Sequence, residues 1–256
     1  RLHVVLDVGV RPARIAARGS SDNAARYAQY LFGAHNRLPV ALATPSLFTL
    51  YQSPPRLEGA LVIAISQSGQ SPDIVEVVEE GRRQGCPTIA ITNDPASPLA
   101  SSAEYPVHLH MGQERAVAAM KTYTASLIAL ALLSAALEQD SSRLEKLTHI
   151  PDVMQITLQG LEPILPRVER FRYMAHSIVI GRGFNYATAF EVALKIKELT
   201  RVITEPYSSA DFRHGPIAMI REGFPVFVIA LRGSVSADLH ALVDELQQKD
   251  AELLLI

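Results

Sequence analysis

The sequence predicts an α/β fold of two tandem subdomains, each built on a doubly wound parallel sheet. Two observations carry this prediction. Continuous apolar runs such as Leu61–Ile65 (LVIAI) alternate with segments of helical periodicity, and such runs are typical of parallel strands buried on both faces. The order strand, Arg-Gly, helix, strand, serine-containing turn, helix, strand also occurs twice along the chain. Strands that alternate with helices favour parallel sheets.

An internal repeat relates the two halves of the chain. A shift of 165 residues places residues 60–91 on residues 225–256, and it superimposes Asp73 on Asp238. The Arg-Gly pairs of the two halves lie one residue out of this register. The repeat therefore indicates a duplicated fold rather than two unrelated domains.

The repeat also sets the expected domain boundaries. We expect a first subdomain over residues 1–145 and a second over residues 146–256, bridged by helices between about residues 125 and 170. Compared with the first copy, the second stops before its last strand and helix. Its serine-containing turn keeps only part of the hydroxyl set of the first.

Composition bounds the class of protein. The chain has 256 residues, 48% of them hydrophobic, and a net charge of -2, which suits one large or two smaller domains and predicts no nucleic-acid partner. The single cysteine, Cys86, excludes an internal disulfide, points to a reducing compartment and is expected to be a buried structural thiol. The apolar stretch Ala125–Leu137 is too short to cross a bilayer, and no secretory signal is visible, so we expect a cytoplasmic protein with no membrane partner.

The segment SQSGQS (residues 66–71) joins a buried strand to a helix and carries three serines, two glutamines and a glycine. Unpaired N–H groups and the helix dipole favour an anion at such a point. A plain helix cap would explain one of these hydroxyls, so a cap and a phosphate cradle both remain open. No Gly-Lys-Ser/Thr follows, which excludes a Walker loop.

Three further segments carry candidate chemistry. ARGSSDNAARYAQY (residues 17–30) places Gly19 in a tight turn and serines at a helix start, on the same sheet edge as the serine loop. In AFEVALKIKELT (residues 189–200), Glu191, Lys195 and Glu198 form one charged stripe on a helix that is otherwise apolar and is expected to be buried almost all round. His214 precedes Gly-Pro in a loop. No His, Cys or carboxylate set has metal-ligand spacing, and we expect no cofactor.

Five motifs in this order resemble the sugar isomerase (SIS) family: ARGSS, SQSGQSPD, GQERAVAAMKTYTASL, ALKIKE and FRHGP. They are most similar to the double-SIS isomerase domain of glucosamine-6-phosphate synthase and to the SIS-type glucosamine-6-phosphate deaminases. The resemblance covers the chain from about residue 14 to residue 256, and it implies that each subdomain has a flavodoxin-like fold.

The resemblance implies a role for particular residues. The expected contacts to a sugar 6-phosphate group are made by Ser21, Ser66, Gln67, Ser68 and Ser71. The expected contacts to the sugar are made by Gly19, Ser20 and Val117. Glu198 matches the glutamate that moves a proton between C1 and C2, Lys195 the lysine near the developing oxyanion, and His214 a histidine that assists ring opening from a neighbouring subunit. A carboxylate base and a near-neutral acid/base are what aldose–ketose isomerisation requires.

The sequence departs from the family pattern in three ways. The glutaminase domain of the synthase and the C-terminal tail with its active-site lysine lie outside this sequence, and Ala119 and Met120 stand where the synthase has serine and threonine. We therefore expect a homodimeric isomerase that deaminates glucosamine 6-phosphate, or a related amino-sugar 6-phosphate, to fructose 6-phosphate. The alternatives are an aminotransferase-type isomerase, a deglycase acting on another sugar phosphate, and a non-catalytic sugar-phosphate-binding regulator.

Overall fold

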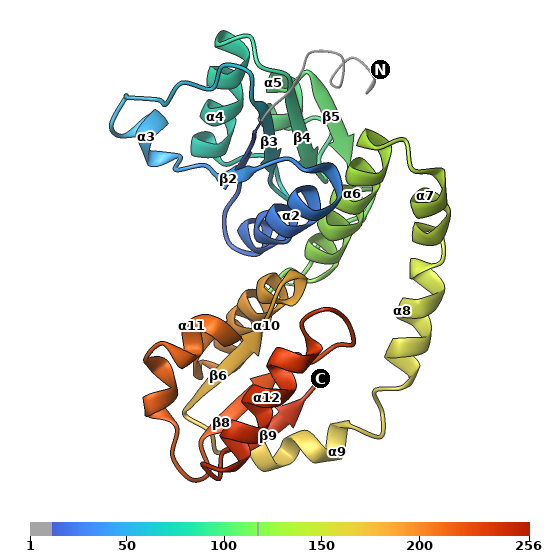
Figure 1. The fold of residues 1–256 in the computed structure, drawn as a ribbon. Helices are drawn as coiled ribbons and strands as arrows, with labels where there is room; N and C mark the ends of the chain where they lie inside the picture. The colour runs from blue at the N-terminus through green and yellow to red at the C-terminus, as the bar shows by residue number, and fades with distance from the viewer. Residues whose placement is uncertain (1–11, 117) are drawn as a thin grey trace. The chain divides into compact units, whose positions relative to one another are not determined.

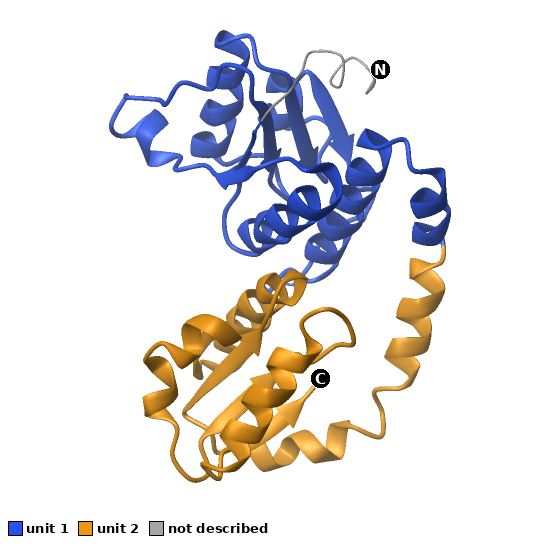
Figure 2. Cartoon of the chain, viewed as in Figure 1, with its two compact units in different colours: residues 1–148 blue, residues 149–256 orange. Residues whose placement is uncertain are grey.

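The chain folds into two compact units, residues 1–148 and 149–256 (Figure 1, Figure 2). The structure is a computed structural model, and it describes residues 12–116 and 118–256. Each unit has its own parallel sheet and its own core, and the two are described separately below.

The first unit is a five-stranded parallel sheet with the strand order β2-β1-β3-β4-β5. Its strands are β1 (Ala13–Ala16), β2 (Val40–Leu42), β3 (Leu61–Ile65), β4 (Thr88–Thr92) and β5 (Tyr105–His108). Its helices are α2 (Ser20–Asn36), α3 (Ser46–Thr49), α4 (Pro72–Arg83), α5 (Pro98–Ser102), α6 (Lys121–Leu137) and α7 (Ser141–Leu147). This is the flavodoxin-like order, in which the chain reverses direction across the sheet between β1 and β3.

Helices cover both faces of this sheet. On one face α2 and α6 pack on the strands, with Leu31 and Leu130 in a shared core. On the other face lie α3, α4 and α5, with Phe48 and Val77 in a second core. The continuous apolar run of β3 is buried at every position because both of its faces are covered.

The second unit is a four-stranded parallel sheet with the order β7-β6-β8-β9. Its strands are β6 (His176–Gly181), β7 (Ile203–Ser208), β8 (Pro225–Val228) and β9 (Glu252–Leu255). Its helices are α8 (Ile150–Gln159), α9 (Leu165–Val168), η1 (Glu169–Phe171), α10 (Phe184–Thr200), α11 (Ser209–Arg213), η2 (Pro216–Met219) and α12 (Ser236–Gln247). Helix α10 packs on one face of the sheet and α11 and α12 pack on the other.

The predicted repeat is visible in the backbone. Helices α2 and α10 have 17 residues each, and both begin after a glycine of nearly identical conformation, φ 56° and ψ -131° at Gly19 against φ 61° and ψ -131° at Gly183. Both helices also end at a left-handed arginine, Arg37 and Arg201. The predicted fold class, two tandem parallel-sheet subdomains, is therefore confirmed.

One expectation about α10 is wrong. The sequence suggested a helix buried almost all round, but Leu199 is 65% exposed and the last four residues of the helix are exposed. The reason is that α10 enters the core along one face only, through Ala189 and Ala193, with Val192 and Ile196 packed beside them. The charged stripe of this helix therefore runs from a buried to an exposed end.

Candidate functional site

The serine loop, residues 66–71, leaves the carboxyl end of β3 and is fixed against the loop that follows β4. The carbonyl oxygen of Gln67 accepts hydrogen bonds from the Asn93 N–H at 3.0 Å and the Thr92 hydroxyl at 3.3 Å. The Gly69 carbonyl oxygen accepts from the Leu99 N–H at 3.1 Å. These bonds to the main chain hold the loop while leaving its side chains available.

Gly69 is required at the centre of this loop. Its φ of +63° is one that only glycine adopts without strain, and a Cβ built there would lie 2.2 Å from the Ser97 hydroxyl oxygen. Ser97 is completely buried and caps α5 by accepting a hydrogen bond from the Ala100 N–H. Because Ser97 is held in place by this cap, the close approach fixes the path of the serine loop.

The hydroxyl groups of the loop retain their hydrogens for a ligand. Ser66 Oγ accepts from the Gly69 N–H at 3.2 Å, and Ser68 Oγ accepts from the Gln70 N–H at 3.3 Å. A hydroxyl that accepts in this way can still donate. Ser71 stands at the N-cap of α4, yet within the described part of the chain its side chain makes no capping hydrogen bond. Capping therefore does not explain Ser71, and the side-chain donors of this loop lie at a helix N-terminus, where an anion is stabilised.

The loop after β1 lies beside the serine loop at the same sheet edge. The Arg18 guanidinium donates from Nε to Asp73 Oδ2 at 2.9 Å, and its Nη2 contacts the same oxygen. Ser20 and Ser21 begin α2 and are half-buried. Sequence reasoning did not identify the ion pair of Arg18 and Asp73. The two residues are 55 positions apart in the sequence, and no local spacing pattern marks them as partners.

A third loop, after β5, is tied to this edge by Asn93. Its side-chain amide donates to the Gly112 carbonyl oxygen at 2.7 Å, and its Oδ1 accepts from the Met111 N–H at 2.9 Å. Val117, the expected sugar contact further along this segment, lies outside the described residues.

In the second unit, α10 carries a cluster of three ionisable side chains. Lys195 Nζ lies 2.7 Å from Glu198 Oε2 and 3.5 Å from Glu191 Oε1. The side chains of Glu191 and Lys195 are 7% and 14% exposed, whereas that of Glu198 is 36% exposed. Glu191 thus anchors the ammonium group from the buried side, and Glu198 is the carboxylate that a ligand can reach. Glu191 belonged to the predicted stripe but not to the expected catalytic set.

His214 lies directly after α11, where its N–H donates to the Asp211 carbonyl oxygen at 3.1 Å. The residue is exposed, and Gly215 with φ +143° turns the chain immediately afterwards. The imidazole is therefore presented to solvent on a sharply turning loop.

Within the described residues, no group of three His, Cys, Asp or Glu side chains is placed to hold a metal ion, and no helix is long and apolar enough to cross a membrane. The first unit thus supplies hydroxyl donors at a helix N-terminus, and the second supplies a lysine between two carboxylates and an exposed histidine.

Comparison with known proteins identifies the family. The SIS domain model matches residues 13–136 and 173–256, which is most of the chain. The chain belongs to the SIS domain family. The two matched segments fall in the two units, so the duplication is one of SIS domains.

Curated SIS relatives include glutamine–fructose-6-phosphate aminotransferases (isomerizing). The protein from Thermus thermophilus is 30% identical over 94% of this chain and 41% of its own length, and that from Methanosarcina acetivorans is 34% identical over 93% and 40%. The chain spans about two fifths of the length of these relatives.

Solved structures agree with this family membership. A Silicibacter pomeroyi protein assigned as a phosphosugar isomerase has a TM-score of 0.92 at 34% identity, covering 99% of this chain and 77% of that protein. The C-terminal domain of glucosamine-fructose-6-phosphate aminotransferase from Francisella tularensis has a TM-score of 0.89 at 25% identity, covering 99% and 74%.

Proposed function

We propose that this SIS chain is a phosphosugar isomerase that converts glucosamine 6-phosphate, or a related amino-sugar 6-phosphate, and water to fructose 6-phosphate and ammonia. The family and the names of its relatives support a phosphosugar substrate.

The observation that carries this proposal is the cluster on α10. A proton must leave C2 of the open-chain sugar and arrive at C1, which requires a carboxylate that can reach both carbons. Glu198 is the more exposed carboxylate of the cluster and accepts from Lys195 at 2.7 Å. In the proposed reaction Glu198 takes the C2 proton and returns it to C1, while the Lys195 ammonium stabilises the negative charge that develops on O1.

The remaining steps follow from this transfer. Proton movement converts the 2-amino aldehyde into a C2 imine; water adds to C2, the C–N bond breaks, and ammonia leaves with the ketone behind. Before this proton transfer, His214 moves the proton that opens the sugar ring, since an imidazole can both donate and accept a proton. We propose that His214 acts in the site of a second subunit of a homodimer.

The serine loop is proposed to bind the phosphate group. The Ser66 and Ser68 hydroxyls accept from the loop backbone and can donate outward, and Ser71 stands at the first turn of α4. Ser21 and Gln67 complete the proposed donor set, and Gly19, Ser20 and Val117 the proposed sugar contacts. Hydrogen bonds to a charged group are the strong ones, so this loop is suited to set affinity.

Incubation of the protein with glucosamine 6-phosphate, followed by assays for ammonia and fructose 6-phosphate, tests the proposal. Equal amounts of both products, formed only with phosphorylated sugar, are expected. Release of an amino acid from a glycated amino acid 6-phosphate, with no turnover of glucosamine 6-phosphate, would replace the deaminase with a deglycase. Binding of sugar phosphates without any turnover would instead indicate a regulator.

A further inference from the structure

His214 directly follows α11, a helix that is too short to be stable by itself. Helix α11 has only five residues, and an isolated helix of this length is unstable in water. Within the described part of the chain, the hydrogen bond found for His214 is the one from its main-chain N–H to the Asp211 carbonyl oxygen. The position of the imidazole therefore depends on what holds α11.

Two kinds of contact hold α11. Phe212 is completely buried in the core, and its ring centroid lies 5.6 Å from that of Tyr207. At the start of the helix, Ser208 and Asp211 form a reciprocal cap, with Asp211 N–H donating to Ser208 Oγ at 3.1 Å and Ser208 Oγ donating to Asp211 Oδ2 at 2.6 Å. Both contacts place the helix, but neither reaches the residue next to His214.

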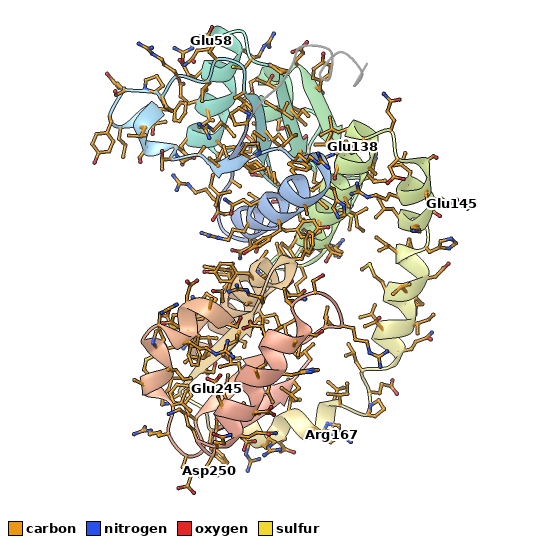
Figure 3. All side chains as sticks on the ribbon, viewed as in Figure 1. Glu58, Glu138, Glu145, Arg167, Glu245 and Asp250 are labelled. Carbon is orange, nitrogen blue, oxygen red and sulfur yellow. The ribbon has the colours of Figure 1, made fainter. Side chains whose placement is uncertain are left out.

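Arg213 is that residue, and its guanidinium is bound to α12 through three nitrogens. Nη1 donates to Asp238 Oδ1 at 2.8 Å, Nη2 to the Asp238 carbonyl oxygen at 3.2 Å, and Nε to Glu245 Oε1 at 3.0 Å. Figure 3 shows Glu245 on α12. Ser209, at the other end of α11, donates to the second carboxylate oxygen of Asp238. Both ends of α11 are thus tied to Asp238 in the first turn of α12, and Arg213 is bound in addition to Glu245 in the last turn.

The internal repeat shows that this use of Asp238 is particular to the second unit. Its counterpart, Asp73, binds Arg18 of the loop after the first strand. The counterpart of Arg18 is Arg182, whose charge is a minor cause of the lowered pKa of Asp238. Among the described residues, the side-chain hydrogen bonds to the Asp238 carboxylate come from Ser209 and Arg213. The aspartate at this position thus binds the loop after the first strand in the first unit, whereas in the second unit it binds the helix that precedes His214.

We propose that Arg213, Asp238 and Glu245 are positioning residues that hold His214 for ring opening. The inference rests on the proposed function, because it assigns a purpose to the placement of a histidine whose role is itself proposed. It predicts that loosening the Arg213 clamp slows only reactions that begin from a closed ring.

The test compares two substrates in deuterated water by NMR, with C1 hydrogen exchange as the readout. Fructose 6-phosphate must open its ring before exchange, whereas 5-deoxyfructose 6-phosphate lacks the hydroxyl that closes the ring. For Arg213→Gln we expect kcat for fructose 6-phosphate to fall about 10- to 100-fold, since a small misplacement of a catalytic group has effects of this size, with KM changed less than about twofold. Exchange of the 5-deoxy compound should be unchanged, and Arg213→Lys should retain more activity than Arg213→Gln.

Controls separate the two levels of the hypothesis. Arg221→Gln removes an exposed arginine of the same unit and should affect neither substrate. If His214→Ala slows both substrates alike or neither, the role of His214 in ring opening is wrong. If His214→Ala is selective but Arg213→Gln is not, the positioning inference alone is overturned. Should the melting temperature show that Arg213→Gln is unfolded, Asp238→Asn keeps the side-chain shape and is judged by the same selectivity.

Discussion

At the scale of single residues, the serine hydroxyls of the loop after β3 shape the loop and are also proposed to bind a phosphate group. Ser66 and Ser68 each accept a hydrogen bond from a backbone N–H two or three residues ahead, which shapes the loop. Their O–H groups are left to donate to an anion. The same atoms can therefore organise the loop and bind the phosphate.

Ser68→Ala should raise KM for the sugar phosphate with a smaller change in kcat. The loss should be about 1.5–3 kcal/mol, the range for a hydrogen bond to a charged group, because binding of the phosphate contributes equally to the substrate complex and the transition state. Steady-state kinetics measure this, with Ser53→Ala, an exposed serine of another loop, as the control. An unchanged KM would remove Ser68 from the phosphate site.

Cys86 was expected to be a buried structural thiol, and the structure confirms that it is free and buried. Its Sγ donates to the Leu57 carbonyl oxygen at 2.9 Å, and burial raises the pKa of the thiol, with a smaller contribution from Glu58. Since the thiolate is the reactive form, the native protein should react with iodoacetamide far more slowly than the denatured chain at pH 8.

The raised pKa of Cys86 also makes the free energy of unfolding depend on pH. The thiol ionises at about pH 8.5 in the unfolded chain and only at a higher pH in the folded protein. Its contribution to the free energy of unfolding is therefore fully present below about pH 8.5 and is lost as the pH rises from there through the pKa of the folded state. In denaturant titrations at increasing pH, the free energy of unfolding of Cys86→Ala should therefore fall less above about pH 8.5 than that of the unmutated protein. Rapid native alkylation would show that the thiol is accessible.

At the scale of elements, the path of the serine loop depends on a glycine that packs against a buried side chain. Gly69→Ala should be destabilised by the left-handed backbone cost of about 1–2 kcal/mol and, in addition, by the collision of its Cβ with Ser97. Gly59→Ala is a matched control, because Gly59 has φ +72° with nothing within 4 Å of a built Cβ. The free energy of unfolding from denaturant titration should therefore fall further for Gly69→Ala. Equal losses would contradict the role given to the contact with Ser97.

The helices α2 and α10 show how much of the site follows from the repeated fold. Both helices have 17 residues and begin directly after a glycine, so the residues of α10 can be aligned with those of α2. In this alignment Glu191 and Lys195 occupy the positions of Tyr27 and Leu31. In the first unit these positions pack in the core against α6. The second unit presents a charged cluster on an identical scaffold.

The strands could be predicted from sequence because burial on both faces leaves a continuous apolar run. The run 61–65 is found with the expected bounds as β3. The ion pairs of Arg18 and Arg213 could not be predicted, because each joins residues that are distant in sequence. The exposure of the last turn of α10 was also missed, since apolar composition does not tell which face a core covers.

At the scale of the whole molecule, the two copies differ in what they supply. The first keeps the full set of loop serines, whereas in the second the Ser236 hydroxyl donates within its own loop, to the Gly233 carbonyl oxygen at 2.6 Å. The second copy in turn carries the ionisable cluster of α10. We interpret the duplication as a division between phosphate binding and proton transfer.

Mixing two inactive variants tests the proposed homodimer. If His214 completes the site of a partner, Glu198→Gln mixed with His214→Ala should regain activity, since a mixed dimer has one intact site. Activity of the mixture is compared with each variant alone after subunit exchange is verified by mass spectrometry. Exchange without recovered activity would contradict a shared site.

The central claim is that Glu198 transfers the proton, and Glu198→Gln tests it most directly. The substitution keeps the side-chain shape and removes the base, so turnover of glucosamine 6-phosphate should fall by about 10²–10⁴-fold or more. Calorimetry should show affinity for the sugar phosphate close to that of the unmutated protein, and Glu222→Gln, which changes an exposed loop carboxylate, should alter neither quantity. Retained binding with lost turnover is the predicted result; undiminished turnover in Glu198→Gln would contradict the account and assign the proton transfer to another group.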